Sequence, residues 1–481
     1  MPSSMDQPQI LNALFPELLW YKEQFQSEYG ILISERGILS VGPAVELENE
    51  IARRQAKGEY VTNRRLARRA LIPGFVNTHS HAFQRAIRGR TEYPRQGKPG
   101  QEDFWSWRGL MYHAASLLDP QEIEAISQAV FVEMVKSGIT RVGEFHYLHH
   151  QSDGTPYENP DELAHRVLRG ARSAGLSVTL LRSFYQRAGV GRPQAEGAQK
   201  IFCDPNLDYY LETLERLQSE GVRVGVTPHS VRAVPRPDLE RLAEYAREKS
   251  LPFHIHVSEQ RKEIEECLQE YGVRPVELLS DIGALGPGTT LVHAIHLGKN
   301  EIQAIGERGC SVASCPTTER NLGDGIVAAR ELLEAGAKFT FGTDSQCQIC
   351  LPEDARQLEY HLRLQTQSRS VLFGDEGEAA VRTMSMLTVN GAESLGVDDA
   401  GLLEEGYQAD LVALDLDHLA LAGCSPESLP LDIIFSFVPG VVTDVWCQGT
   451  EVVSHRYHRA ESQAQDNLRR VLRKLREGVP R

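Results

Sequence analysis

Two histidines, His79 and His81, stand one serine apart just after the apolar run ALIPGFV. Residues i and i+2 of a β-strand share one face, so both imidazoles would point the same way at the end of a strand. Side chains of the same chemical kind end four later apolar runs: His229, His256 with Glu259, His293 and Asp344. Structural histidines are the alternative, but recurrence at separate run ends favours a shared metal site.

Imidazoles and a carboxylate suit a borderline divalent metal such as Zn²⁺. We predict one zinc ion per chain, held by His79, His81, His256 and Asp344. The segment VRVGVTPHSVRAV contains no lysine that could bridge a second ion. A single ion of this kind would make a nucleophile from water at neutral pH, which is the chemistry of a hydrolase.

The strands and helices predicted around these residues form a repeating pattern. Eight short apolar runs alternate with helical stretches, and each run turns polar at its C-terminal end. The stretch PRPDLERLAEYAREKS, for example, has helical spacing of Leu239, Leu242 and Tyr245. Alternating strands and helices indicate parallel βαβ units, and eight of them predict an α/β fold of the (β/α)8, TIM-barrel type. Such barrels place the active site at the C-terminal ends of the strands.

The flanks of the barrel differ from it. Residues ~31–70 and ~401–455 look like short strands, and either group alone would make too small a sheet to be stable. We therefore expect one small β-sandwich built from both chain ends, rather than two separate appendages. The predicted domains are 1–70 and 401–481 for the sandwich parts and 71–400 for the barrel. The segment QDNLRRVLRKLREGV is expected to be a helix packed on the body or on a second subunit, rather than on a membrane.

Composition narrows the possible partners and the compartment. The chain has 481 residues and a formal net charge of −15, which argues against nucleic acid as a partner. No apolar stretch is long enough to span a membrane. The eight scattered cysteines suit reduced thiols in the cytoplasm. Cys347 and Cys350 form a Cys-x-x-Cys pair whose spacing is more simply a coincidence than a redox device.

The order of these motifs resembles the amidohydrolase superfamily. The late segments GYQADLVALD and VTDVWCQGTEVV resemble its composite sandwich. Within the superfamily, the resemblance is to the formimidoylglutamate deiminase family, through HSHAFQRA, FWSWR, GEFHYLHH, PHSVRAV, HIHVSEQ, LVHAIHL and CPTTERNLGDG. It implies zinc-dependent hydrolysis of N-formimidoyl-L-glutamate, a step of histidine degradation, to N-formyl-L-glutamate and ammonia. It also implies a homodimer.

The resemblance implies roles for individual residues. Glu259 and His293 match a proton-transfer pair, while Asp344 would accept a proton in addition to binding the metal. Positions that match substrate-binding residues are Gln84, Arg108, Tyr147, His229 and Arg232. Two segments, FGTDSQCQICLPED and SFYQRAGVGRPQ, match more loosely, so the reaction is better defined than the acidic amine it acts on.

The chemistry of these residues agrees with those roles, and each has an alternative. Arg108 and Arg232 could pair with a dicarboxylate inside an acidic protein, or form ordinary surface ion pairs. Glu259 could protonate a leaving nitrogen, or be a solvated acid at the start of a helix in SEQRKEIEEC.

Other interpretations concern the whole protein and three further histidines. A purine-type deaminase of the same superfamily and a non-catalytic barrel scaffold are the alternative functions. His146, His149 and His150 are expected to be polar loop residues.

Overall fold

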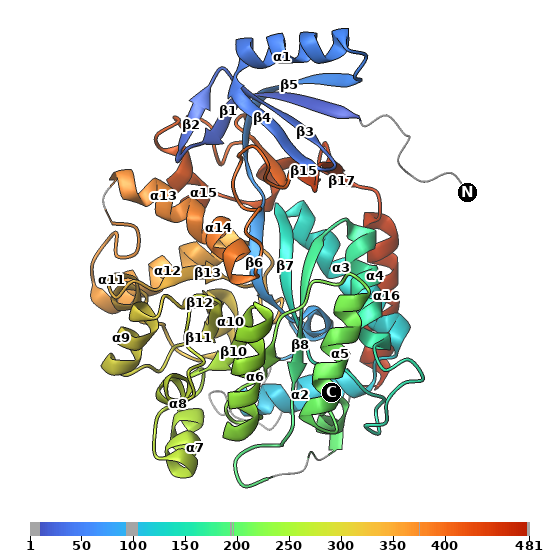
Figure 1. Ribbon diagram of the computed structural model, residues 1–481, viewed down its shortest axis with the longest axis vertical. Helices are drawn as coiled ribbons and strands as arrows, with labels where there is room; N and C mark the ends of the chain where they lie inside the picture. The colour runs from blue at the N-terminus through green and yellow to red at the C-terminus, as the bar shows by residue number, and fades with distance from the viewer. Residues whose placement is uncertain (1–9, 93–103, 193–194, 196, 375, 479–481) are drawn as a thin grey trace.

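The computed structural model describes residues 10–92, 104–192, 195, 197–374 and 376–478, so the outermost parts of the predicted terminal domains lie outside it. Within these residues eight strands form the barrel (Figure 1). They are β6 (Phe75–Ser80), β7 (Ile139–His146), β8 (Ser177–Phe184), β9 (Thr227–Pro228), β10 (Phe253–Val257), β11 (Thr289–His293), β12 (Ser311–Ser314) and β13 (Lys338–Phe341). Each one coincides with a predicted apolar run.

The barrel strands are parallel and follow one another in sequence order. They lie in two four-stranded sheets, β6 to β9 and β10 to β13. Single bridges join the two sheets: Val226 pairs with Phe253, and Ser80 pairs with Asp344 just after β13. The second bridge brings the first and last strands of the barrel together, and it lies at the predicted metal ligands.

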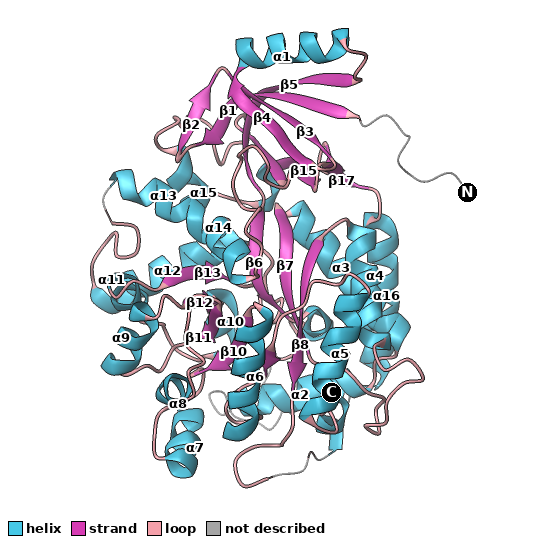
Figure 2. Ribbon diagram, viewed as in Figure 1, coloured by secondary structure: helices cyan, strands magenta, loops and turns pink. Residues whose placement is uncertain are grey.

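Helices cover the outside of the barrel, as Figure 2 shows. The predicted helix after Pro235 is α6, and its apolar face, with Leu239 and Leu242, is buried. The barrel helices are α3 (Pro120–Lys136), α4 (Glu162–Ala174), α5 (Leu207–Ser219), α6 (Arg236–Lys249), α7 (Arg261–Tyr271), α8 (Pro275–Asp281), α9 (Lys299–Glu307), α10 (Pro316–Leu322), α11 (Ala329–Glu334), α12 (Leu351–Thr366), α13 (Glu376–Leu387) and α14 (Val389–Ser394).

Both chain ends meet in one β-structure beside the barrel. Strand β5 pairs with β1 on one side and with β14 on the other, so it joins the N-terminal and C-terminal strands. These strands are β1 (Leu11–Tyr21), β2 (Gln24–Ser27), β3 (Tyr29–Ser34), β4 (Gly37–Pro43), β5 (Val61–Pro73), β14 (Leu411–Asp415), β15 (Val442–Cys447), β16 (Thr450–Ser454) and β17 (Tyr457–His458). The composite sandwich expected from the sequence is therefore present, while the exact domain boundaries stay a prediction.

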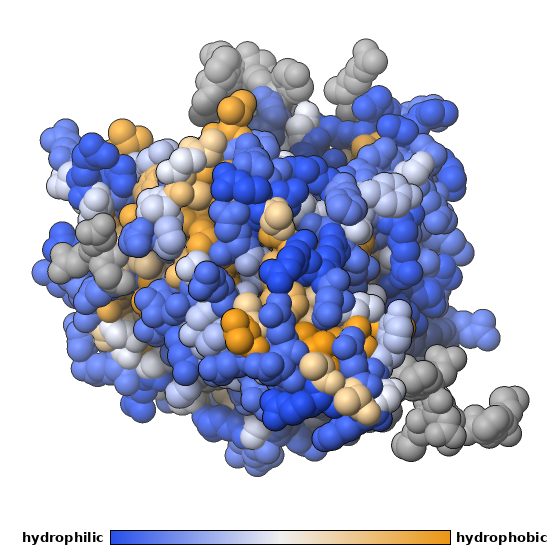
Figure 3. All heavy atoms as spheres, turned by 90° about the horizontal axis from the view of Figure 1, so that it is seen from above, coloured by the Kyte–Doolittle hydropathy of each residue, from blue (hydrophilic) through white to orange (hydrophobic). Residues whose placement is uncertain are grey.

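The N-terminal part differs from the sequence expectation in two ways. Strand β1 starts at Leu11, about twenty residues before the expected sheet, and α1 (Ala44–Ala56) interrupts the strands. Five of the thirteen residues of helix α1 are charged, and only Leu47 and Ile51 are buried in the core. A short helix with so small an apolar face gives a weak periodic signal. The outer face over this end of the molecule is mostly hydrophilic (Figure 3).

The C-terminal helix α16 (Glu461–Gly478) lies along α3 of the barrel (Figure 1). Val471 and Leu475 are buried in this contact, and Lys474 pairs with Glu122 of α3 at 2.8 Å. Packing on the body, one of the two expected positions, is therefore confirmed. Across the described residues, no helix is both long and apolar enough to cross a membrane.

Candidate active site

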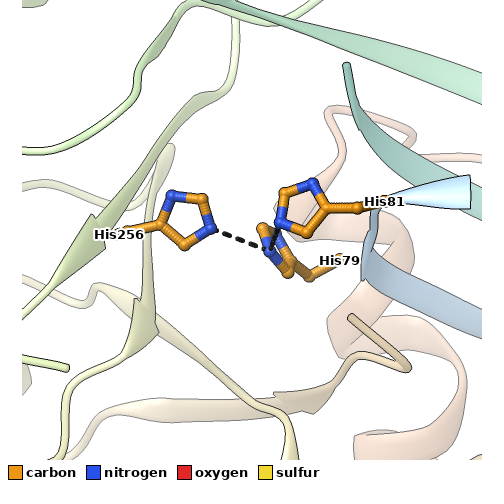
Figure 4. A group of neighbouring side chains, drawn as sticks. All are labelled: His79, His81 and His256. Atoms are coloured by element: carbon orange, nitrogen blue, oxygen red, sulfur yellow. Dashed lines mark hydrogen bonds between the residues drawn. The ribbon is translucent and has the colours of Figure 1, made fainter. Parts of the chain in front are cut away.

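Three imidazoles meet at the C-terminal end of the barrel. His79 belongs to β6, His81 comes directly after the last residue of that strand, and His256 belongs to β10. All three are buried. The Nε2 atom of His79 lies 3.1 Å from Nε2 of His81 and 3.1 Å from Nε2 of His256 (Figure 4). Ligand atoms roughly 2.0–2.1 Å from a tetrahedral ion lie about 3.3 Å apart. The three nitrogens therefore have the spacing of ligands around one metal.

In His81 and His256 the Nδ1 atom makes a hydrogen bond, which leaves Nε2 as the nitrogen with a lone pair for a metal. Nδ1 of His81 donates to the carbonyl oxygen of Phe145 at 2.8 Å, and Nδ1 of His256 donates to that of His229 at 3.0 Å. A carbonyl can only accept, so each Nδ1 carries the proton and each Nε2 keeps its lone pair. Burial also lowers the pKa of His81 to about 3 and holds the pKa of His256 well below its usual value, which keeps both rings neutral.

Asp344 completes the donor set. One carboxylate oxygen lies 3.3 Å from Nε2 of His81 and 3.7 Å from Nε2 of His79. Two backbone hydrogen bonds of 3.0 Å fix this placement: the Asp344 N–H donates to the His79 carbonyl, and the Asp344 carbonyl accepts from the His81 N–H. The four residues predicted as ligands thus lie together, and the set of three nitrogens and one carboxylate fits a divalent ion.

Glu144 of β7 is a supporting residue that the sequence analysis missed. Its carboxylate accepts 2.6 and 2.7 Å hydrogen bonds from the Ser80 hydroxyl and the Ala82 N–H, on either side of His81. Burial raises the pKa of Glu144 to about 8. The sequence shows only that Glu144 is an acid inside the apolar run GITRVGEFH. A buried acid needs a hydrogen-bonding partner from another part of the fold.

Glu259 and His293 face the metal donors from neighbouring strand ends. A carboxylate oxygen of Glu259 lies 3.6 Å from Nε2 of His293, which is 3.8 Å from Asp344. Burial lowers the pKa of His293, but nearby carboxylates, Glu259 first, outweigh this and raise it to about 10. Glu259 precedes α7 and is only 5% exposed. The interpretation of Glu259 as a solvated helix-start acid is therefore wrong.

The five predicted substrate residues line one cavity with these groups. Gln84 lies in the short helix η1 (Ala82–Ile87), and its amide donates to the Tyr147 hydroxyl at 2.6 Å. Arg108 comes from α2 (Phe104–Ser116), which lies across the barrel mouth. The lining includes His81, Gln84, Arg108, Tyr147, His229, Arg232, His256, Glu259, His293 and Asp344.

The two arginines differ from surface ion-pair partners. Arg232 is 6% exposed, and its guanidinium lies 3.6 Å from Glu259 and 3.4 Å from Glu263. Both guanidiniums also lie near the Trp105 ring, at 5.0 Å for Arg108 and 5.6 Å for Arg232. Two guanidiniums therefore line the cavity that also holds the metal donors, which suits an anionic ligand.

Three histidines differ from the polar loop residues expected from the sequence: His146 is the last residue of β7, and His149 and His150 lie in the loop that follows but are buried there. All three side chains are buried. They surround Arg182, whose guanidinium makes two 2.7 Å hydrogen bonds to Asp204. The sequence analysis failed here because the loop folds inward over this charged pair.

This buried pair gives a stability prediction. Replacing Asp204 with asparagine should leave the Arg182 charge without a counter-ion and cost about 3 kcal/mol of unfolding free energy. Thermal and urea denaturation would measure the loss. Asp208→Asn is the matched control, because Asp208 pairs with Arg241 on the surface at 2.7 Å. Equal destabilisation by both variants would contradict the importance of the buried pair.

The cysteines are free thiols throughout. Cys350 is buried just before α12, while Cys347 is partly exposed and lies 3.9 Å from the Thr318 hydroxyl. No disulfide joins them, and their role is not assigned.

A parallel barrel with metal donors and acid–base groups at its mouth, beside a composite sandwich, defines a barrel hydrolase. The sequence model of the Amidohydrolase family matches residues 70–452. A formimidoylglutamate deiminase of Pseudomonas aeruginosa is 37% identical over 411 residues, 84% of this chain and 89% of that one. A 5-methylthioadenosine/S-adenosylhomocysteine deaminase of Natronomonas pharaonis is 30% identical, over 72% and 73% of the two chains. An amidohydrolase crystal structure from Brucella melitensis superposes with a TM-score of 0.84 at 33% identity, over 98% and 100% of the chains.

The chain belongs to the amidohydrolase family. It is a hydrolase that acts on C–N bonds, of the deaminase type. The resemblance to formimidoylglutamate deiminases, first indicated by short motifs, extends over most of the chain.

Proposed function

We propose that this protein hydrolyses N-formimidoyl-L-glutamate to N-formyl-L-glutamate and ammonia, with one Zn²⁺ ion per chain. The observation that carries the proposal is the cavity, in which three converging Nε2 atoms and Asp344 lie beside a non-ligand carboxylate and two guanidiniums. The similarity to a relative named formimidoylglutamate deiminase supports the same substrate.

The metal would be held by His79, His81, His256 and Asp344. An ion in that position supplies Lewis acidity, which makes a nucleophile available from water at neutral pH. Asp344 can take up a proton from the attacking water at its oxygen nearest His293. Glu259 is placed to give a first proton to the imino nitrogen, and the proton taken up by Asp344 supplies the second, so that the C–N bond breaks with ammonia as the leaving group. The hydroxyl proton of the tetrahedral centre then replaces the proton that Glu259 gave. His293 donates from Nε2 and stabilises the charge that develops on the tetrahedral centre.

The rest of the cavity would bind the glutamate part of the substrate. A dicarboxylate entering a chain of net charge −15 needs local positive charge, which Arg108 and Arg232 supply. A guanidinium can bind a carboxylate through two parallel hydrogen bonds, so each arginine can orient one carboxylate. Tyr147, Gln84 and His229 line the same cavity, where they would contact the linear amidine.

Arg108 offers a direct test of carboxylate binding. Arg108→Gln should raise KM about tenfold to a hundredfold, because a hydrogen bond to a charged group contributes about 1.5–3 kcal/mol. The value of kcat should change much less, since Arg108 lies away from the reacting atoms. Steady-state kinetics on formimidoylglutamate measure both constants. The control is Arg241→Gln, whose guanidinium pairs with Asp208 on the surface. A fall in kcat without a change in KM would contradict this role.

The decisive experiment for the substrate is a comparison of ammonia release from formimidoylglutamate and from S-adenosylhomocysteine by the purified zinc-loaded protein. We expect turnover of the first and little of the second. Purine-type turnover with silence on formimidoylglutamate would replace this proposal with the alternative deaminase activity. Silence on both, with metal bound, would favour a non-catalytic scaffold.

A further inference from the structure

A buried carboxylate lies behind His293, on the side away from the cavity. Glu319 belongs to α10, in the segment CPTTERNLGDG, and is 3% exposed. One of its oxygens lies 3.3 Å from Nδ1 of His293. The carboxylate also accepts hydrogen bonds from the Cys315 N–H at 2.8 Å and the Ser314 hydroxyl at 3.2 Å. The last residue of β12 and the residue that precedes α10 therefore hold the Glu319 side chain in place, independently of its contact with His293.

The backbone at His293 has an uncommon conformation, and a contact such as the one with Glu319 is needed to hold the side chain. Its φ is +71°, and that of Ala294 is +50°, both in the left-handed region that residues with a side chain rarely adopt. This turn at the end of β11 aims Nε2 at Glu259 and Asp344, 3.6 and 3.8 Å away. The ring can still rotate about its side-chain bonds, and the atom that can fix this rotation is Nδ1.

We propose that Glu319 is a positioning residue for the reaction, which holds the His293 ring through Nδ1 so that Nε2 points at the reacting centre. This inference rests on the proposed function, because it assigns His293 a part in that chemistry. A carboxylate can only accept, so this contact also keeps a proton on Nδ1, while Nε2 keeps the proton that it donates. This role explains why Glu319 is a buried acid in the motif CPTTERNLGDG, to which the proposed metal and substrate sites assign no function.

A purely structural role is the competing explanation, since Glu319 also accepts the Cys315 N–H at the start of α10. Glu319→Gln separates the two roles. Glutamine keeps the size of the side chain and the oxygen that the Cys315 N–H and Nδ1 of His293 share, but it removes the negative charge that faces His293. Asp354→Asn is a matched control, because Asp354 is a buried acid that accepts the Thr317 N–H of the same helix at 3.0 Å. No hydrogen bond or ion pair joins Asp354 to His293.

The test is a double-mutant cycle on formimidoylglutamate hydrolysis. Glu319→Gln should lower kcat about 10–100-fold, the usual range for an outer partner of a site histidine, with KM and metal content unchanged. In a His293→Gln background the same change should have less than a twofold effect, because Glu319 then has nothing to position. Asp354→Asn should leave kcat near the parent value in both backgrounds. An equal fall in kcat in both backgrounds, or no fall at all, would overturn the inference.

A measurement without turnover keeps the inference separate from the proposed function. In histidine-labelled, zinc-loaded protein, NMR should detect a slowly exchanging Nδ1 proton that disappears in His293→Gln. Glu319→Gln should shift this proton and speed its exchange, whichever substrate the enzyme accepts. An unchanged signal would contradict the contact. A wild-type enzyme silent on formimidoylglutamate would instead overturn the substrate assignment while this measurement still decides the role of Glu319.

Discussion

Replacing Glu259 with glutamine is expected to lower kcat by about 10²–10⁴-fold while the protein stays folded and keeps its metal. Glutamine has nearly the same shape as glutamate, but it cannot deliver a proton to the departing nitrogen. Glu259 is not among the proposed ligands, and its carboxylate contacts His293 and Arg232 at 3.6 Å each. Initial rates of ammonia release, with metal content measured on the same samples, give both numbers.

The matched control for this variant is Glu266→Gln. Glu266 lies on α7, pairs with Lys262 at 3.9 Å and is not among the residues that line the cavity. Its replacement should leave kcat and KM close to the wild-type values. A fully active Glu259→Gln enzyme would show that another group supplies the proton. Loss of metal from Glu259→Gln would show instead that this carboxylate belongs to the metal site.

Removal of the metal is the second change with a large expected effect. Prolonged chelation should abolish ammonia release, and stoichiometric Zn²⁺ should restore it, because the nucleophile depends on Lewis acidity. The reloaded protein should also melt at a higher temperature, since a ligand at 100 times its Kd stabilises the folded state by about 2.7 kcal/mol. His256→Asn should lose activity and metal affinity together.

The control for that variant is His254→Asn on the same strand. His254 is also buried, but its Nε2 donates to the Ser394 carbonyl at 2.7 Å and takes no part in the three-histidine cluster. Its replacement should lower the melting temperature without changing the zinc stoichiometry. Full activity after verified removal of all metal would rule out the metal-dependent mechanism.

Much of the barrel and its donor set could be predicted from the sequence, because the signals are local. Apolar runs show where strands lie, and the polar residues that follow them must gather at one end of a parallel barrel. His79, His81, His256 and Asp344 each follow this rule, and the structure brings them together. Their roles as ligands remain a prediction.

The supporting residues could not be predicted for a physical reason. Glu144 and Glu319 are buried acids whose partners lie on other elements, so their meaning depends on tertiary contacts. The same holds for His146, His149 and His150, which look like loop residues until Arg182 and Asp204 are seen beneath them.

The central claim is that one divalent ion is held jointly by residues from the first, fifth and eighth barrel strands. The most direct measurement is anomalous X-ray scattering from crystals of the zinc-loaded protein, collected on both sides of the zinc absorption edge. We expect one strong peak about 2.0–2.2 Å from Nε2 of His79, His81 and His256 and from an oxygen of Asp344. A peak elsewhere, or fully active crystals without any peak at this position, would contradict it.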